Sequence, residues 1–391
     1  MSEINKKVEL VRSALIKNSP LNHPLTGHPI AECEEFVKQL YIDNLCVIAQ
    51  YENEDTENQL KFIQRIMAAA AMQDSIMENV KNALQLNAEQ FGEFMQQCRE
   101  NKLSDIFLLD SMLIACADGV PNKKQIEFLA EIAQGLGIGR QRLEWLSGLA
   151  KCILAQDSEQ YAELCKQIPH DEKTEILPCV VCYLKEFVTG VLLDIDDLLY
   201  IYAKTKAEFD FSQLGVLSRK NIIIENIIFK YDEDALEIKS SEKLEINNCE
   251  IENILLNCYC IEKVNIVKSV FYNLGSKGAF CNICFENTDE LFIQESSFNS
   301  CNGFYYVLRL ENIEAIKLLK CKFVDCVGRD DYLIYFSGGV EKTRIILQEN
   351  KFTGCKCGSG YLIYAGKISS ENIKLLDNKL NMDEGIALIN L

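Results

Sequence analysis

The chain has 391 residues, of which 48% are hydrophobic and 25% charged, so it has enough apolar material for a packed core and is not mainly disordered. Its formal net charge of −18 repels phosphate backbones, which excludes nucleic-acid binding over a broad surface. No apolar run is long enough for a transmembrane segment, and the N-terminal residues lack the apolar centre of a signal peptide, so we expect a cytoplasmic protein.

The first half of the chain predicts an all-helical domain over residues 1–205. Apolar positions recur near every 3.6 residues, and all six prolines and all three histidines lie before Lys185. The Pro-rich segment 19–30 predicts a loop. Its two histidines, His23 and His28, have no third ligand for zinc beside them, so a structural role is favoured. Helices are expected at 3–17, 31–51, 57–84, 88–99, 104–117, 122–136, 139–154, 158–167 and 174–189.

A further helix is expected at 194–207, at the junction of the two halves. Asp194, Asp196 and Asp197 would then lie at the positive end of its dipole. This helix would cap the first turn of the second domain, which is predicted to span residues 206–391.

The second half changes to short strands rich in Ile, Leu, Val, Phe and Tyr, and seven segments align into a repeat of about 25 residues. Each copy has one bulky residue, with a small or polar residue two positions earlier. The bulky residues are Ile228, Ile251, Phe271, Phe298, Phe323, Phe352 and Leu380. Three successive copies add Cys301, Cys326 or Cys355 three positions later. Stacked turns would bury both sets in ladders.

This repeat resembles the right-handed parallel β-helix family, the fold of pectate lyases and of many non-enzymatic relatives. Leucine-rich repeats fit less well, because no copy carries LxxLxLxxN followed by a helix. The predicted fold class is therefore α + β multidomain, with an N-terminal all-α helical bundle and a C-terminal right-handed parallel β-helix of about seven short coils.

Eighteen cysteines in a large chain without a signal peptide indicate free thiols rather than disulfides. Close pairs occur at Cys179/Cys182, Cys258/Cys260, Cys281/Cys284 and Cys355/Cys357. We interpret them as packing residues rather than zinc ligands, since free cysteine behaves as a small hydrophobic residue. Residues three apart in a strand point to opposite faces, so Cys281 and Cys284 are expected to point apart.

The stretch LLDSMLIACADGVPNKKQIEFLAEIAQGLGI at 108–138 joins an apolar helix ending in Ala-Asp-Gly to a capped helix ending in Leu-Gly-Ile. It resembles the TerB-like family of tellurite-resistance proteins over about residues 60–165. The resemblance implies an acidic helical bundle, binding of a divalent cation, and a place in bacterial systems that answer chemical stress or phage. It identifies Asp118 as the metal residue, with Asp110 and Glu127 as nearby candidates.

One residue departs from the family pattern, and Asp118 has a second interpretation. Gln125 stands where the family usually has a Glu, which weakens the metal interpretation. The alternative is that Asp118 only anchors the turn by accepting backbone N–H bonds.

Catalytic signals in the second half are sparse. It has no histidine and four arginines, and its best cluster is Arg329-Asp330-Asp331, in a predicted turn that a solvated loop explains equally well. Tyrosines recur on the second strand of each copy and could form an outward aromatic stripe, with Tyr332 and Tyr361 as contact candidates.

The segment GIALINL at 385–391 reads as an apolar strand without a cap. Ile386 and Leu388 are therefore expected to meet a protein partner, a second copy of the chain or the protein's own helical domain. The favoured function is a non-enzymatic interaction scaffold or sensor, in a stress-response or anti-phage system by resemblance alone. The alternatives are a carbohydrate-active β-helix enzyme and a module that responds to a divalent cation; no other cofactor is expected.

Overall fold

The computed structural model describes residues 25, 27–51, 56–72, 75–167, 179–195, 197–214, 216–230, 235–274, 281–337, 343–366, 368–381 and 386–390. The chain divides into two compact units, Met1–Phe187 and Val188–Leu391. This division falls before the boundary expected at residue 205, because the chain from Gly190 onward already forms strands.

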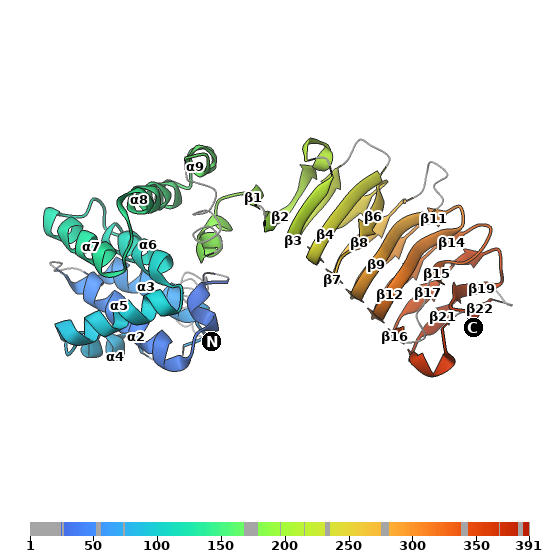
Figure 1. Cartoon of the computed structure of the whole chain (residues 1–391), viewed down its shortest axis with the longest axis horizontal. Coiled ribbons are helices and arrows are strands. Elements are labelled where there is room, and N and C mark those ends of the chain that lie inside the picture. The colour runs from blue at the N-terminus through green and yellow to red at the C-terminus, as the bar shows by residue number, and fades with distance from the viewer. Residues whose placement is uncertain are drawn as a thin grey trace, which may run out of the picture. The chain divides into compact units, whose positions relative to one another are not determined.

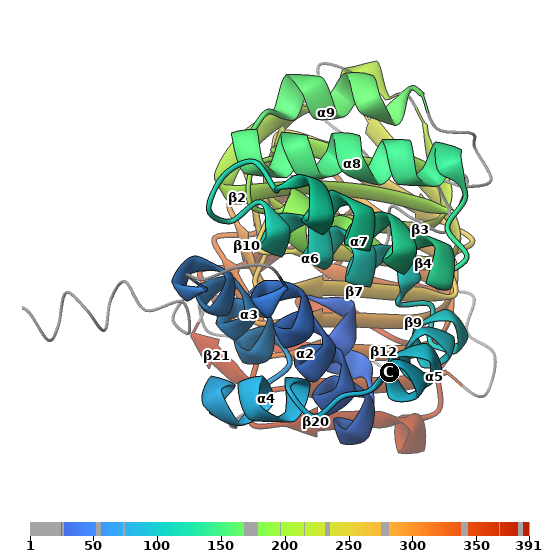
Figure 2. The same ribbon diagram turned by 90° about the vertical axis from the view of Figure 1, so that its left-hand side faces the viewer.

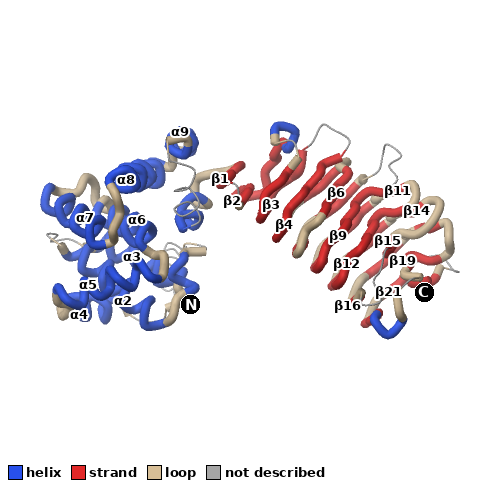
Figure 3. The backbone as a smooth tube through the Cα atoms, in the orientation of Figure 1, coloured by secondary structure: helices blue, strands red, loops and turns tan. Residues whose placement is uncertain are grey.

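The first unit is helical (Figure 1, Figure 3). A short 3-10 helix, η2 (Pro29–Glu32), precedes the α-helices, and residues 179–184 are helical as well. The helix expected at 3–17 lies outside the described residues, and the one expected at 57–84 is two helices. The α-helices are α2 (Glu35–Gln50), α3 (Glu57–Ala69), α4 (Ile76–Ala83), α5 (Ala88–Glu100), α6 (Ser104–Ala115), α7 (Lys123–Gly135), α8 (Arg140–Ala155) and α9 (Ser158–Cys165).

Helix α6 is the core of the helical unit. Every residue from Asp105 to Ala115 is buried, as expected for a mostly apolar helix inside a bundle. It contacts α2, α7 and α8, and Figure 2 shows α8 running beside α9. Within the residues that the structure describes, no helix is long and apolar enough to cross a membrane.

The expected turn between α6 and α7 is confirmed. The Asn122 side chain accepts from the Gln125 amide at 3.0 Å, and the Gln125 side chain accepts from the Asn122 amide at 2.9 Å, which is a complete capping box. Gly119 has a φ of +126°, a backbone conformation that residues with a Cβ rarely adopt, so glycine suits this turn.

The helix expected at 194–207 is wrong. Residues 194–195 and 198–207 belong instead to β1 (Gly190–Ile195) and β2 (Leu198–Asp210), which pair antiparallel. Leu199, Tyr200, Ile201 and Ala203 are buried, and tyrosine and isoleucine favour a strand over a helix. The strand preference of these buried residues therefore outweighs the acidic residues, which by themselves favour the start of a helix.

The second unit is a parallel β-solenoid of about seven turns (Figure 1). Apart from β1, all the strand pairs described are parallel. Among the longest strands, β2 pairs with two other strands, and β3, β4, β9 and β12 each pair with three. After β2 the strands are β3 (Leu217–Lys230), β4 (Ala235–Asn247), β5 (Glu250–Glu252), β6 (Leu255–Tyr259), β7 (Lys263–Val267), β8 (Val270–Tyr272), β9 (Cys281–Gln294), β10 (Ser297–Asn299), β11 (Asn302–Gly303), β12 (Tyr306–Leu319), β13 (Lys322–Val324), β14 (Val327–Gly328), β15 (Ile334–Ser337), β16 (Arg344–Gln348), β17 (Lys351–Thr353), β18 (Lys356–Cys357), β19 (Tyr361–Tyr364), β20 (Ile373–Leu376), β21 (Lys379–Asn381) and β22 (Ala387–Asn390).

The predicted ladder of aromatic rings is confirmed. Phe271, Phe298, Phe323 and Phe352 stack in sequence, with ring centroids 4.9, 4.6 and 4.8 Å apart and planes within 7° of parallel. All four are buried, so each coil closes the apolar face of the one before it.

The first position predicted for the ladder of bulky residues is wrong by one residue. Phe229, not Ile228, pairs with Ile251, and Ile228 is only half-buried. Asn226 has a φ of +59° and makes the corner that Asn248 makes one coil later. Counting from these corners, rather than from small side chains, gives the correct register.

The small and polar residues of the repeat form a second buried ladder. The Cys249 amide donates to the Ser269 hydroxyl at 3.2 Å, and the Ser269 amide donates to the Ser296 hydroxyl at 3.1 Å. Further on, the Cys321 amide donates to Asn350 Oδ1 at 2.9 Å. Small polar side chains are thus needed here because they hydrogen-bond backbone groups at a buried corner.

The predicted thiol ladder is also confirmed. Cys301, Cys326 and Cys355 are buried, and their thiols donate to carbonyl oxygens of the coil before, for example from Cys326 to Phe298 at 3.2 Å. These cysteines recur at the repeat period because each one packs at the same buried position of its coil.

The corners of the coils use left-handed backbone, often without glycine. Lys268, Lys320 and Glu349 have φ values of +54°, +56° and +56°. A Cβ in this region costs about 1–2 kcal/mol per residue, and Asn tolerates it better than Lys or Glu. We therefore expect Lys268→Asn to raise the free energy of unfolding by up to about 1 kcal/mol.

Urea denaturation of the full chain, followed by the β-sheet circular dichroism signal, measures this gain. Lys263→Asn is the matched control, since Lys263 is also exposed but lies in β7, where Asn is a poor strand former. A gain from Lys263→Asn as large as that from Lys268→Asn would contradict the role assigned to the corner.

Candidate functional site

The most distinctive surface of the solenoid comes from a break in strand alternation. In four successive coils, two consecutive residues both point inward: Asn282-Ile283, Val307-Leu308, Leu333-Ile334 and Leu362-Ile363, all with 0–1% exposure. Because one step of the alternation is missing, the residues on either side of each buried pair lie on the same outer face. These outer residues are Cys281/Cys284, Tyr306/Arg309, Tyr332/Tyr335 and Tyr361/Tyr364. We call these eight residues the outer row.

The tyrosines of the outer row contact one another across the coils. The Tyr335 ring stacks on Tyr306 at 4.4 Å and on Tyr364 at 5.1 Å between centroids. Tyr332 lies 5.0 Å from Tyr364, with tilted planes. The expectation of an outward aromatic stripe is therefore met by Tyr332, Tyr335 and Tyr364, which are half-buried, and by Tyr361, which is 38% exposed.

Glycines hold the loops beside the outer row close to it. Gly303 and Gly328 pair in register between β11 and β14. A Cβ on Gly303 would collide with the Tyr306 carbonyl, and a Cβ on Gly328 would collide with the Tyr332 carbonyl. Glycine is therefore required where each loop folds back against the start of the next strand.

The three residues of the predicted catalytic cluster, Arg329, Asp330 and Asp331, lie in the loop between β14 and β15 in different environments. Arg329 and Asp330 are exposed, whereas the Asp331 carboxylate accepts a hydrogen bond from the Tyr306 hydroxyl at 3.1 Å. Burial raises the pKa of the Asp331 carboxyl. Asp331 therefore contacts the outer row, where its carboxylate holds the Tyr306 hydroxyl.

The contact candidates at the C-terminal segment lie in different environments. Ile386 and Leu388 are partly buried against the solenoid core, so they cover it rather than project from it. The Tyr332 hydroxyl accepts from the Asn390 side chain at 3.3 Å, which ties the outer row to β22. Of the four predicted contact residues, Tyr361 is the most exposed.

The last coil exposes apolar ladder residues that the sequence analysis did not propose as contacts. Leu375 and Leu380 are 41% and 42% exposed, although their register partners Leu347 and Phe352 are each 1% exposed. Leu376 is 45% exposed beside them. The sequence does contain a signal for this exposure, because Leu380 is the final bulky residue of the repeat and no later described coil covers it.

The metal candidate Asp110 is a buried core residue. One oxygen, Oδ2, accepts from the Tyr41 hydroxyl at 2.7 Å and lies 3.1 Å from His28 Nε2. The other, Oδ1, accepts from the Tyr183 hydroxyl at 2.5 Å. His28 Nδ1 accepts from the Ile30 amide at 3.3 Å, so Nε2 carries the proton and donates to Asp110.

This Asp110 cluster, formed by Asp110, His28, Tyr41 and Tyr183, is at most 1% exposed. Burial and the neighbouring carboxylate of Asp110 raise the pKa of both phenols. The cluster joins η2, α2, α6 and the helical residues 179–184, so it fastens four segments of the helical unit.

The other two metal candidates lie on the surface. Asp118 is exposed and accepts from the Asn58 side chain at 2.5 Å, which links the turn after α6 to α3. Glu127 pairs with Lys123 at 3.4 Å, and its side chain is 60% exposed. Among the described residues, no group of three or more His, Cys, Asp or Glu side chains is arranged to hold a metal.

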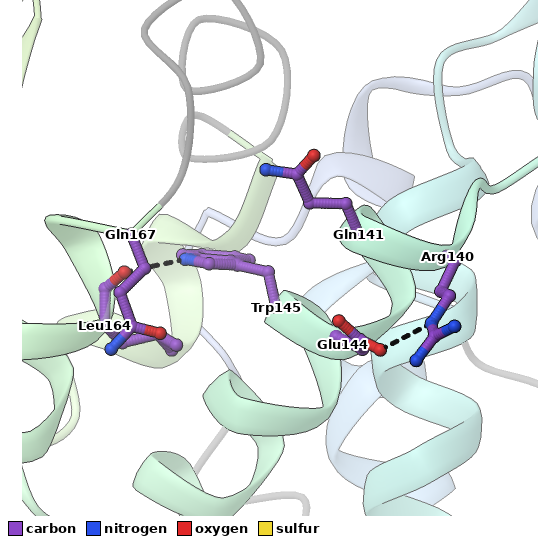
Figure 4. A pocket seen from close by; sticks show the side chains of 6 residues that line it. All are labelled: Arg140, Gln141, Glu144, Trp145, Leu164 and Gln167. Atoms are coloured by element: carbon purple, nitrogen blue, oxygen red, sulfur yellow. Dashed lines mark hydrogen bonds and ion pairs between the residues drawn. The ribbon is translucent and has the colours of Figure 1, made fainter.

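The helical unit has a hollow between α8 and the end of α9 (Figure 4). Trp145 is 4% exposed, and its indole N–H donates to the Leu164 carbonyl at 3.2 Å. Arg140 Nε lies 2.8 Å from Glu144 Oε1. The hollow is lined by Arg140, Gln141, Glu144, Trp145, Leu164 and Gln167. Its charged side chains and its indole N–H are thus already engaged within the unit.

A second hollow lies over β3, β4 and β6 of the solenoid and is lined by cations. Arg219 pairs with Asp194 at 2.7 Å, and Lys239 pairs with Glu237 at 3.1 Å. Lys239 also lies over the Tyr259 ring, 5.9 Å from its centroid. The cations are neutralised by adjacent carboxylates, so the hollow is not a strong anion site.

Comparison with protein-family models and with curated proteins found no match to this chain.

Proposed function

We propose that the protein is a non-enzymatic interaction scaffold whose solenoid presents the last coil to another protein chain. The observation that carries this proposal is the exposure of Leu375 and Leu380 at ladder positions that earlier coils bury. Covering an apolar side chain of this size stabilises a complex by about 1.5–3 kcal/mol when burial is complete.

The strands of the last coil favour docking of a protein chain over a small ligand. β20, β21 and β22 each pair on one side with the coil before, through β16, β17 and β19. Backbone groups on the open side of a parallel coil are available to another strand. Apolar ladder residues and open strand edges together are the features that strand addition uses.

We propose that the partner is a second copy of this chain. A two-fold contact places identical patches against each other, so a patch must complement itself. The last coil meets this condition, because it combines apolar side chains with charges of both signs. The apolar residues are Leu375, Leu376 and Leu380, and the charged residues among them are Lys374, Asp377 and Lys379. When two such ends meet, apolar surface is buried on both partners. Because each end carries charges of both signs, the contact does not bring only like charges together.

Size-exclusion chromatography with light scattering at micromolar concentration tests the proposal. Wild type is expected to be a dimer, and Leu375→Asp/Leu380→Asp a monomer with unchanged circular dichroism. Val120→Asp is the matched control, since Val120 is 95% exposed in the helical unit and is expected to leave the dimer intact. A monomeric wild type, or a double variant that remains dimeric, would count against the second copy as partner.

The cellular setting proposed for the scaffold is a bacterial stress-response or anti-phage system. Its support is the resemblance of residues 108–138 to the TerB-like motif, which α6, the Gly119 turn and the capped α7 match in form. Genes next to this one in its genome test the setting, and neighbours limited to unrelated housekeeping functions would contradict it.

A further inference from the structure

The last coil contains two open strands that meet at one corner. β20 and β21 are joined by Asp377 and Asn378, and Asp377 has the left-handed φ of +52° that marks the corners of earlier coils. Among the strand pairs described, β20 pairs only with β16 and β21 only with β17, both in the coil before. The backbone groups on the other edge of each strand are therefore open.

The two strands carry matching patterns of side chains on either side of the corner. Leu375 and Leu380 take inward positions, since their register partners Leu347 and Phe352 are each 1% exposed. Each leucine lies between two outward residues. Read away from the corner, the two series are Leu376-Leu375-Lys374 and Lys379-Leu380-Asn381. One strand therefore repeats the inward and outward pattern of the other in the reverse direction.

Two-fold symmetry restricts how two such ends can pair. Strands that face each other across a two-fold axis at the end of the solenoid run antiparallel, and directly opposite residues in an antiparallel pair point to the same face. An axis through the corner pairs β20 of one copy with β21 of the other, and β21 with β20. Leu375 then lies opposite the partner's Leu380, and both leucines point inward.

An axis through the middle of a single strand satisfies fewer open groups. It would pair β20 with itself, or β21 with itself, and leave the neighbouring strand unpaired. The corner axis pairs both strands and keeps like charges apart, which matters because like charges directly opposite each other are destabilising. Lys379 lies opposite the partner's Leu376, which the aliphatic part of the lysine can cover. Lys374 lies opposite the partner's Asn381.

The corner itself belongs to the open edge. In the buried ladder of polar residues, the amide of one corner donates to the side chain one coil later, as Asn350 does to Asn378 Oδ1 at 3.0 Å. Within the described residues, no later coil offers an acceptor to the Asn378 amide. The open edge is thus continuous from β20 through the corner to β21, and an axis at the corner covers all of it.

We propose that two copies of the chain pair end to end about a two-fold axis at the Asp377-Asn378 corner, with Leu375 against the partner's Leu380 at two equivalent contacts. This inference rests on the proposed function, because it takes a second copy as the partner. It adds the strands that pair, their direction and their register.

The experiment mixes two full-length variants, Leu375→Asp and Leu380→Lys, and follows their mass by size-exclusion chromatography with light scattering at micromolar concentration. Each variant alone is expected to be monomeric, because both contacts of its dimer would bury a charge against a leucine. The mixture is expected to form a heterodimer. One contact then joins the two introduced charges of opposite sign, and the other contact keeps two leucines.

Leu376→Lys mixed with Leu375→Asp is the matched control and is expected to remain monomeric. Leu376 is similarly exposed, at 45% against 41% for Leu375, but it takes an outward position and does not face Leu375 in this pairing. Circular dichroism of each variant checks that the coils remain folded. A monomeric wild type overturns both the second copy as partner and this pairing, whereas a dimeric wild type whose aspartate and lysine variants stay monomeric when mixed overturns the pairing alone.

Cysteine substitutions test the same contact without adding charge. Oxidation of Leu375→Cys mixed with Leu380→Cys is expected to give a covalent dimer above the wild-type background, with peptide mapping that links positions 375 and 380. Each cysteine variant alone is expected to give no more covalent dimer than wild type. Strong links from 375 to 375, or from 380 to 380, would show that the axis passes through a strand and not through the corner.

Discussion

Phe323→Ala is expected to lower the free energy of unfolding of the solenoid by about 3–5 kcal/mol. The Phe323 ring is fully buried and stacks between Phe298 and Phe352 at 4.6 and 4.8 Å. Its removal leaves a cavity inside one coil and ends two ring contacts at once. Because each coil of a solenoid contacts only its neighbours, the damage should uncouple the coils on either side.

Urea denaturation and hydrogen exchange of the full chain measure these two effects. Amides of β16, β17 and β20 are expected to exchange faster than those of β5 and β8, which lie before the cavity. Phe304→Ala is the matched control, since Phe304 is 40% exposed, and a change of less than about 0.5 kcal/mol is expected. Equal losses from the two substitutions would mean that the ring ladder does not stabilise the solenoid.

Asp110→Ala is expected to destabilise the helical unit by about 3–5 kcal/mol, the cost of removing one partner from a buried ionic and hydrogen-bonded group. The substitution leaves the Tyr41 and Tyr183 hydroxyls and the His28 Nε2 proton buried without their acceptor. Each of these groups was taken from water on folding, and no solvent can replace the lost carboxylate at a site of 0% exposure.

Thermal unfolding followed by the helical circular dichroism signal gives the measurement. Asp118→Ala removes an exposed carboxylate from the turn after α6 and is expected to cost less than about 1 kcal/mol. Tyr41→Phe and Tyr183→Phe each delete one donor, and each is expected to cost less than Asp110→Ala because the carboxylate keeps its other partners. If Asp110→Ala lowers the stability of the helical unit no more than Asp118→Ala does, the Asp110 cluster does not hold the unit together.

Local patterns in the sequence predicted much of this architecture. The 3.6-residue period located α5 to α9, and the Asn122–Gln125 pair predicted the start of α7. The repeat of about 25 residues predicted the solenoid and the burial of Phe271 to Phe352. These features depend on residues close in the chain or on a period, which a sequence displays directly.

Contacts between distant residues were decided only by the tertiary structure. Asp110 was a candidate metal ligand until His28, Tyr41 and Tyr183, which lie 82, 69 and 73 positions away, were seen to occupy its oxygens. The sequence predicts Cys281 and Cys284 on opposite faces of a strand, whereas the buried pair Asn282-Ile283 between them interrupts the alternation, so both cysteines flank it on the outer side. Spacing along the chain encodes which face a side chain takes within a regular element, but corners and long-range packing decide which side chains meet.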